Sequence, residues 1–259
     1  MESKNTILSQ AELELLEALV LRHGKIVTFA QIQAAAGSQS SASALRQRVA
    51  QMSRAGWLVR LRRGLYLVVT DISTLGFVDV SDLVIAQALN PMAYVSFERA
   101  LQHHALFDQL LARIDAVTTG KSRRYNVLGT LYTFSKIQPE LYWGFEEMTL
   151  DGRRVAVANP EKALLDILYF RTSAYAVSLV LEKLQTGREG LEFDRLKAHA
   201  RRYPVGIVRK IGFLLDLAGV DTGDLLTAAV KASSYSRLTQ DAKCFNARWR
   251  LYYDPQVVG

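Results

Sequence analysis

The chain has 259 residues, of which 49% are hydrophobic and 22% charged, and its 32 Lys and Arg against 25 Asp and Glu give a formal net charge of +7. This composition is typical of an ordinary globular protein, and the length suggests two domains at roughly 150 residues each. No apolar run approaches the roughly 20 residues that cross a bilayer, the N-terminus lacks a signal-peptide pattern, and the single Cys244 excludes an internal disulfide. We therefore predict a cytoplasmic protein with no membrane, metal or cofactor.

Two stretches with the form of a capping box mark the first helices. Residues 9–12 read S-x-x-E and precede apolar residues at helical spacing, which predicts a helix over about residues 9–22. Residues 28–31 repeat the pattern and predict a helix over 29–36. Gly37 is expected to end this second helix, because glycine accepts the backbone conformation of a helix C-cap.

A third helix follows the serine-rich turn at residues 38–41. Its apolar positions Leu45, Val49 and Met52 lie on one face and are assigned to the core. Gly56 ends the helix. The second and third helices, joined by this short turn, have the form of a helix-turn-helix. In that motif the second of the two helices enters the DNA major groove.

After Gly56 the hydrophobic period changes from that of a helix to that of a strand. Residues 57–61 and 65–69 alternate around the turn at 62–64, which predicts a β-hairpin with basic residues at its tip. A short β-branched segment at 26–27 supplies one more small strand. Helix, strand, helix, turn, helix and two-stranded wing is the order of a winged helix-turn-helix domain.

The charge of the chain is concentrated in residues 21–70. This stretch contains no Asp or Glu, so the remainder of the chain is nearly neutral. Its basic residues are Arg22, Lys25, Arg46, Arg48, Arg54, Arg60, Arg62 and Arg63. A single arginine on a helix surface is usually only solvated, but an acid-free run of this length indicates a polyanionic partner, most often nucleic acid.

Ten residues are candidates for contact with double-stranded DNA. They are Gln39, Ser41, Ser43, Arg46, Gln47, Arg48, Arg54, Arg60, Arg62 and Arg63. The first five lie at the start of the predicted recognition helix, the end that reaches base edges. Arg46 and Gln47 are the best candidates for base readout, because Arg pairs with guanine and Gln with adenine through two hydrogen bonds. The other arginines are better placed for phosphates.

A second, larger domain is expected after a boundary within residues 71–80, so we assign residues 1–75 to the winged helix and 76–259 to the second domain. The Asp151-Gly152 pair predicts a hairpin, and Asn159 before a proline predicts a helix start. The expected strands are 94–95, 114–119, 130–137, 142–150, 153–158 and 249–253. The expected helices are 82–89, 96–106, one from 160, 174–184, 193–203, 205–217 and 224–231. The predicted fold class is α+β, an N-terminal winged helix-turn-helix followed by a mixed α/β domain.

A nuclease is the enzymatic alternative, because a DNA-binding module fused to an α+β domain is compatible with one. The residues available for a metal site are Asp115, Glu146, Glu147, Glu161, Lys162 and Asp166. Capping and solvent exposure at a helix start account for Glu161 and Lys162, and no strand carries the acid and lysine spacing of a nuclease. His103 and His104 point in different directions on a helix. No phosphate-binding glycine motif is present. We predict no catalytic residue.

Lys121, Arg123 and Arg124 form a second basic cluster beside Tyr125. The simpler interpretation is an exposed loop. The alternative is an additional contact with phosphates.

Three stretches resemble one known family. They are LVRLRRGLY at residues 58–66, YVSFERALQHH at 94–104 and VANPEKALLD at 157–166. Together they are similar to AbiEi-type antitoxins of type IV toxin-antitoxin systems. The resemblance implies a protein that represses its own operon by binding inverted repeats through the winged helix. It also implies a second domain that counters a cognate nucleotidyltransferase toxin. The alternative is a winged-helix repressor with a dimerising or ligand-sensing second domain and no toxin.

Overall fold

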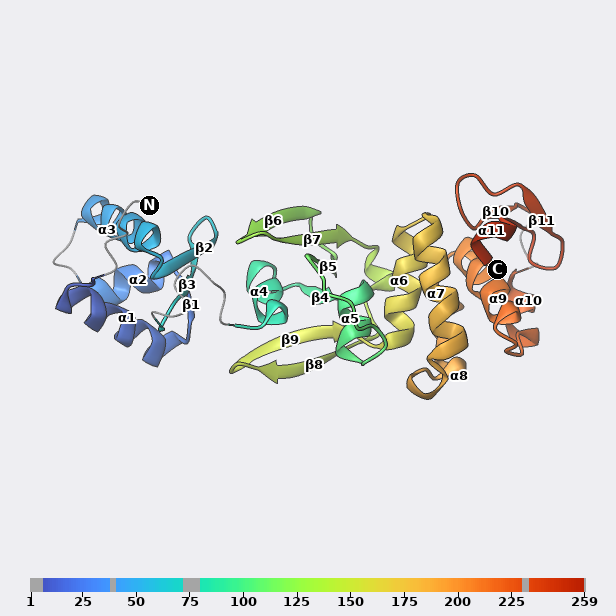
Figure 1. Ribbon diagram of the computed structural model, residues 1–259, viewed down its shortest axis with the longest axis horizontal. Helices are drawn as coiled ribbons and strands as arrows, with labels where there is room; N and C mark the ends of the chain where they lie inside the picture. Colours follow the sequence, from blue (N-terminus) through green and yellow to red (C-terminus); the bar gives the residue numbers. More distant parts are fainter. Residues whose placement is uncertain (1–6, 38–40, 72–79, 230–232, 259) are drawn as a thin grey trace.

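A computed structural model describes residues 7–37, 41–71, 80–229 and 233–258. Its parts follow one another along the long axis of the molecule (Figure 1). The winged helix lies at one end, a six-stranded sheet lies in the middle, and a helical lobe with a small sheet lies at the other end. The mixed helix and strand content confirms the predicted α+β class. The proposed domain boundary at residues 75 and 76 lies outside the described residues.

The N-terminal domain has the predicted order of elements. They are α1 (Gln10–His23), β1 (Ile26–Thr28), α2 (Phe29–Ala36), α3 (Ala42–Ala55), β2 (Leu58–Arg62) and β3 (Leu65–Val68). Both predicted capping boxes are present, at Ser9 and at Thr28. Gly56 ends α3 in the left-handed conformation, with φ of 94°. The strands form an antiparallel sheet in the order β1-β3-β2.

This small sheet is covered on both faces because its side chains alternate. Leu58 and Val68 pack with α1, α2 and α3, whereas Val59, Leu61 and Leu67 belong to the core that continues into the second domain. Arg153 of the second domain also donates hydrogen bonds to the carbonyl oxygens of residues 23 and 26, at 3.0 and 2.5 Å. The sheet therefore joins the two domains, and the helices of the winged helix face away from the joint.

The middle of the molecule is a mixed sheet in the order β6-β7-β5-β4-β9-β8. Its strands are β4 (Ala93–Val95), β5 (Arg113–Thr118), β6 (Arg123–Val127), β7 (Thr130–Lys136), β8 (Phe145–Leu150) and β9 (Arg153–Ala158), and its helices are α4 (Asp82–Leu89) and α5 (Phe97–His103). The pairs β4 with β9 and β5 with β7 are parallel. The predicted Asp151-Gly152 turn joins β8 and β9, with positive φ at both residues.

Three predictions for this region were wrong in detail. Arg123 and Arg124 of the basic cluster interpreted as an exposed loop begin the strand β6, and only Lys121 lies in the loop before it. The sequence gives little sign of this strand because Val127 is its only buried residue. The strand expected from Tyr142 begins at Phe145, because the 3-10 turn Pro139–Leu141 and a left-handed Gly144 occupy the intervening chain. The helix expected to reach Leu106 ends at His103.

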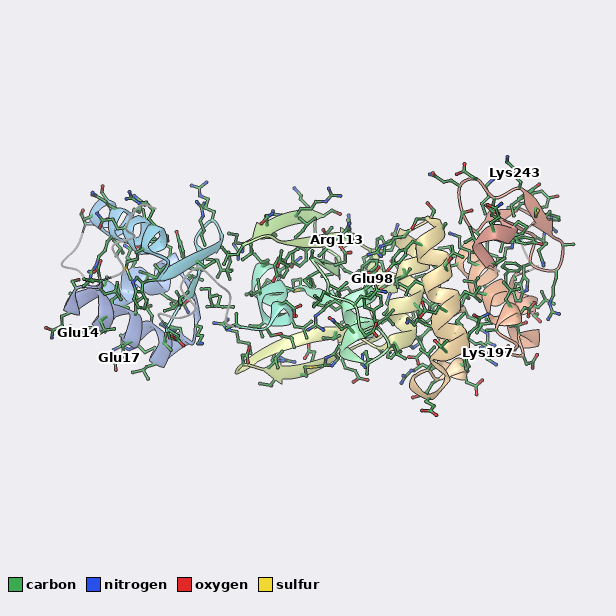
Figure 2. The ribbon with its side chains drawn as sticks, viewed as in Figure 1. Glu14, Glu17, Glu98, Arg113, Lys197 and Lys243 are labelled. Atoms are coloured by element: carbon green, nitrogen blue, oxygen red, sulfur yellow. The ribbon has the colours of Figure 1, made fainter. Side chains whose placement is uncertain are left out.

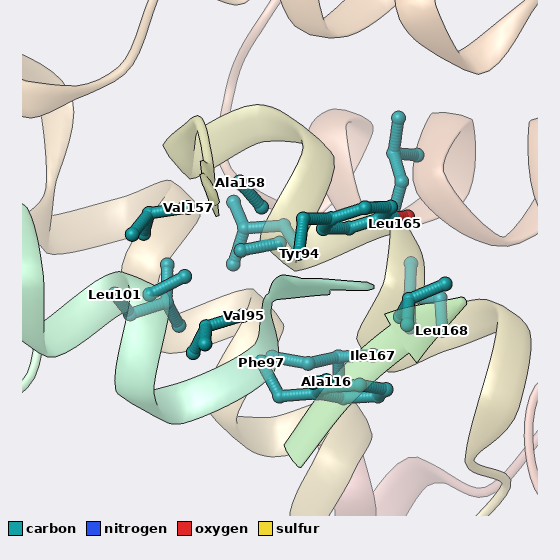
Figure 3. Packing of buried hydrophobic residues seen from close by; sticks show 14 of the residues in the cluster. Tyr94, Val95, Phe97, Leu101, Ala116, Val157, Ala158, Leu165, Ile167 and Leu168 are labelled. Atoms are coloured by element: carbon teal, nitrogen blue, oxygen red, sulfur yellow. The ribbon is translucent and has the colours of Figure 1, made fainter. Parts of the chain in front are cut away.

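The helical lobe is built around α6, which contacts the sheet and four other helices, α5, α7, α8 and α9. Its elements are α6 (Pro160–Phe170), α7 (Ala174–Thr186), the 3-10 turn Arg188–Gly190, α8 (Phe193–Ala200), α9 (Val205–Leu217), α10 (Gly223–Ala229), β10 (Ser236–Arg237), β11 (Cys244–Asn246), β12 (Leu251–Tyr253) and α11 (Pro255–Val258). Figure 3 shows Leu165, Ile167 and Leu168 packed beside Tyr94 and Phe97 from the sheet region. The predicted 205–217 helix and the N-cap at Asn159 are confirmed.

The polar residues of α6 are buried, and the expectation of solvent exposure for Glu161 and Lys162 was wrong. The Lys162 and Asp166 side chains are 0% exposed, and Lys162 Nζ lies 2.7 Å from Asp166 Oδ1. The hydroxyls of Tyr94, Ser96 and Tyr203 each donate a hydrogen bond to Asp166, at 3.0, 2.8 and 2.7 Å. Burial lowers the pKa of Lys162, against the opposing effect of Asp166.

Glu161 has partners of its own. Its carboxylate accepts hydrogen bonds from the backbone N–H of Glu192 and from Arg195 Nε, both at 2.8 Å. It therefore ties the start of α6 to α8. Two buried carboxylates on one helix are thus each satisfied by residues from other elements, as buried charges require.

Gly212 on α9 allows a close contact with Trp249. A methyl group on Gly212 would lie 2.2 Å from two carbons of the Trp249 ring, which is 0% exposed and donates from Nε1 to Asp216 at 2.6 Å. Gly212→Ala is therefore expected to lower the free energy of unfolding by about 1 to 3 kcal/mol, measured by chemical denaturation. Gly206→Ala on the same helix is the control, because its nearest neighbour would be Ser236 Oγ at 3.5 Å. Equal stabilities of the two variants would contradict this explanation.

Candidate nucleic-acid interface

The recognition helix α3 presents a polar face to solvent. Leu45, Val49 and Met52 are buried at 2 to 3% exposure, which confirms their assignment to the core. The opposite face carries residues at helical spacing that are all exposed: Ser43, Gln47, Ala50 and Arg54. The first turn of α3 contains no acidic residue, so the positive end of the helix dipole is uncompensated. The second domain does not cover this face.

A groove of about 660 Å³ runs between α3 and the β2–β3 hairpin. It is lined by Phe29, Arg46, Val49, Ala50, Ser53, Arg54, Arg60, Arg63, Gly64 and Tyr66. Four of these residues are arginines and none is acidic. No described Asp or Glu lies within ion-pair distance of any of the four. The groove is therefore a concave cationic surface with an aromatic and aliphatic floor.

The strand register explains why the hairpin contributes Arg60. Leu58 faces the helices and Val59 faces the second domain, so Arg60 points to the helix side beside Tyr66, its partner on β3. The hairpin tip is fixed in place because the backbone N–H of Phe29 donates to the carbonyl of Gly64 at 2.9 Å. Gly64 has φ of 75°, a turn conformation that glycine accepts without strain.

Acidic residues of the same domain lie elsewhere. Figure 2 shows Glu14 and Glu17 on α1, at the edge of the domain opposite to α3. Hydrogen bonds from the Ser9 backbone and hydroxyl lower the pKa of Glu12, and the charge of Arg48 adds to this effect. The domain therefore has separate acidic and basic sides.

Not all predicted contact residues line the groove. Arg48 turns toward α1, with Nε 4.0 Å from Glu12 Oε1. Arg62 is half-buried because a β-bulge between residues 60 and 62 breaks the alternation of β2. Ser41 Oγ caps α3 by accepting from the N–H of Ala44 at 3.1 Å. Gln39 lies outside the described residues.

A strand of the second domain that carries basic residues packs against the hairpin. The β6 strand lies against β2, and Lys121, Arg123 and Arg124 at its start are exposed. In Figure 1, α3, the hairpin and β6 follow one another along the upper edge of the molecule. These cations are visible in the sequence, but the contact of their strand with the wing is not, because it joins residues more than 60 positions apart.

Four of the five carboxylates considered for a nuclease are engaged by partners from the rest of the chain, and the fifth, Glu146, is exposed on β8. Asp115 pairs with Arg113 and Arg171, both at 2.7 Å, and Glu147 pairs with Arg154. Glu161 and Asp166 have the partners described above. Within the described part of the chain, no three His, Cys, Asp or Glu residues are placed to hold a metal ion. Nε2 of His104 lies 2.9 Å from the carbonyl oxygen of Ala158, so it belongs to the packing between α5 and β9.

The order of elements and the cationic groove are those of a winged-helix domain. Residues 14–69 match the family model described as a transcriptional regulator, AbiEi antitoxin. This match confirms the resemblance predicted for the N-terminal part of the chain. The fold of the whole chain is similar to the crystal structure of RV2827C protein from Mycobacterium tuberculosis. The TM-score is 0.67 at 14% identity, over 98% of this chain and 95% of that chain.

A comparison with curated proteins finds no match. Among the described residues, no helix combines the length and apolar character of a membrane span.

Proposed function

We propose that this protein is a DNA-binding antitoxin of a type IV toxin-antitoxin system that represses its own operon by binding inverted repeats. The observation that carries the proposal is the groove between α3 and the hairpin, with four arginines and no acidic residue. The family match over residues 14–69 supports a regulatory rather than an enzymatic role. The first test is a gel-shift titration with the duplex that precedes its own gene, with a random duplex of equal length as competitor.

In this proposal α3 enters the major groove of the operator. Arg46 and Gln47 contact base edges from the N-terminal half of the helix. Gln39, Ser41 and Ser43 make further contacts with the DNA at the start of this helix. Arg54, Arg60 and Arg63 neutralise phosphates on both sides of the groove. Arg48 and Arg62 lie outside the protein groove and contact phosphates on either side of it. The exposed cations of β6 continue the same surface onto the second domain.

Arg46→Ala is expected to weaken binding to the specific duplex by about 1 to 3 kcal/mol and to relax preference at one base position. The Arg46 guanidinium lies 6.0 Å from the centroid of the Phe29 ring, and both residues line the groove. Binding to a library of randomised operators would measure the preference. Equal losses on specific and random DNA would show that Arg46 contacts phosphate only.

The antitoxin part of the proposal assigns the second domain to a nucleotidyltransferase toxin as a functional partner. The test is co-expression with the neighbouring reading frame. The proposal predicts that a neighbouring nucleotidyltransferase arrests growth and that the full chain restores it. A full chain that represses the operon without relieving toxicity would instead indicate a plain winged-helix repressor with a dimerising or ligand-sensing domain.

A further inference from the structure

The small sheet at the C-terminal end has an exposed face that carries aromatic and basic side chains. The strands lie in the order β10-β12-β11, and Tyr252 of the central strand pairs with Arg237 on one side and Phe245 on the other. These three residues therefore form one row across the sheet. Leu251, which points to the opposite face, is 0% exposed. Tyr235 and Arg250 come directly before β10 and β12. They share this face because the Tyr235 ring lies 6.2 Å from the Tyr252 ring and the Arg250 guanidinium lies over the Tyr235 ring.

The aromatic rings on this face form a contiguous exposed patch. Tyr235 is 61% exposed and Phe245 is 45% exposed. Ring centroids lie 5.4 Å apart between Tyr235 and Phe245, and 5.0 Å apart between Phe245 and Tyr252. Large aromatic side chains on a sheet face are usually covered by another layer, so this patch is suited to an external flat ligand.

Two arginines extend the patch. The Arg250 guanidinium lies 5.1 Å from the Tyr235 ring centroid, and that of Arg237 lies 4.8 Å from the Tyr252 centroid. Each is held by a backbone carbonyl, Arg237 by Ala242 at 2.6 Å and Arg250 by Ser233 at 2.5 Å. Planar guanidinium groups fixed beside aromatic rings give a rigid surface on which bases stack.

The charge around the patch favours an anionic ligand. Between residues 233 and 253 the basic residues are Arg237, Lys243, Arg248 and Arg250, and the one acidic residue is Asp241. Lys243 projects outward from this lobe (Figure 2). Its exposed position lets it reach a phosphate beside the aromatic rings. Arg248 already pairs with Asp216 at 3.2 Å, whereas a purely apolar partner would supply no counter-charge to Arg237, Lys243 and Arg250.

We propose that this face binds single-stranded nucleic acid, with bases stacked on Tyr235 and Phe245 and the backbone beside Lys243. Unpaired bases offer the flat faces that such rings take, whereas the bases of a duplex are already stacked on each other. The patch lies at the end of the molecule opposite to the winged helix (Figure 1), so it is separate from the proposed operator site.

The test uses the full chain with Arg60→Ala and Arg63→Ala, which removes two cations of the N-terminal groove. Fluorescence anisotropy would measure its binding to labelled oligouridylate RNA and oligothymidylate DNA. Phe245→Ala and Tyr235→Ala are each expected to weaken binding by about tenfold, and Phe245→Trp is expected to retain it. Tyr175→Ala is the matched control, because Tyr175 is a 54% exposed tyrosine on α7. The difference between the two oligonucleotides would show whether RNA or DNA is preferred.

Three outcomes would overturn the proposal. One is no binding of either strand, and another is binding that Phe245→Ala leaves unchanged. The third is sedimentation of the protein as a dimer that Phe245→Ala dissociates, which would assign the face to a second copy of the chain. Unfolding curves of the variants show whether each one is folded. Phe245→Trp keeps an aromatic ring at this position, so it distinguishes loss of stacking from loss of structure.

Discussion

Replacement of Arg60 and Arg63 together by alanine is expected to weaken binding to specific and random DNA alike. Both residues line the groove from the hairpin side, and a wing positions the duplex through phosphates rather than bases. Each neutralised phosphate steepens the slope of log K against log salt by about 0.9. Loss of two such contacts therefore predicts a roughly 60-fold loss of affinity at 0.1 M salt, relative to 1 M salt. Anisotropy titrations with both duplexes would measure it.

Arg154→Ala is the matched control for this experiment. Arg154 is an exposed arginine on β9, with 78% side-chain exposure and an ion pair to Glu147, so its removal changes the net charge without altering the groove. It is expected to change affinity by less than about twofold, because charges farther away than the Debye length of about 8 to 10 Å are largely screened. Similar losses in Arg154→Ala and in the double variant would indicate that only the overall charge matters.

Asp166→Ala is expected to have the largest effect on stability, a loss of about 3 to 5 kcal/mol in the free energy of unfolding. The substitution leaves the fully buried Lys162 without its counter-charge. It also removes the acceptor for the hydroxyls of Tyr94, Ser96 and Tyr203. Denaturant unfolding followed by circular dichroism would measure the change, with refolding checked for reversibility.

The control is an exposed ion pair of similar spacing. Lys197 Nζ lies 3.0 Å from Asp194 Oδ1 on α8, and the Asp194 side chain is 99% exposed. Asp194→Ala should therefore change the free energy of unfolding by no more than about 1 kcal/mol. An Asp166→Ala variant as stable as Asp194→Ala would mean that the network around α6 contributes little.

The N-terminal domain was predictable because its signals are local. Capping boxes at Ser9 and Thr28 and the helix-ending Gly37 and Gly56 depend on neighbours within a few residues. The predicted bounds of α2 agree with the structure for this reason. The alternation of the hairpin likewise needs only the strand itself.

The interior of the second domain was not predictable in the same way. Lys162 and Asp166, four residues apart, have the spacing of an ordinary surface ion pair on a helix. Their burial depends on Tyr94 and Tyr203, which lie 72 and 37 residues from Asp166 in the sequence. No local pattern contains that information.

The candidate interface was predicted in its composition and only partly in its geometry. The sequence identified the arginines of α3 and the hairpin, and the structure brings four of them into one groove. It also turns Arg48 toward Glu12 on α1. The position of β6 beside β2 depends on the packing of two domains, so neither element indicates it alone.

The salt dependence of wild-type binding to the duplex that precedes its own gene tests the central claim most directly. If about four of the eight cations in residues 21–70 each neutralise one phosphate, log K falls against log salt with a slope of roughly −3.6 per protomer. The slope should become less steep by about 1.8 when Arg60 and Arg63 are replaced. A wild-type affinity that stays constant between low and high salt would contradict the assignment of this groove to DNA.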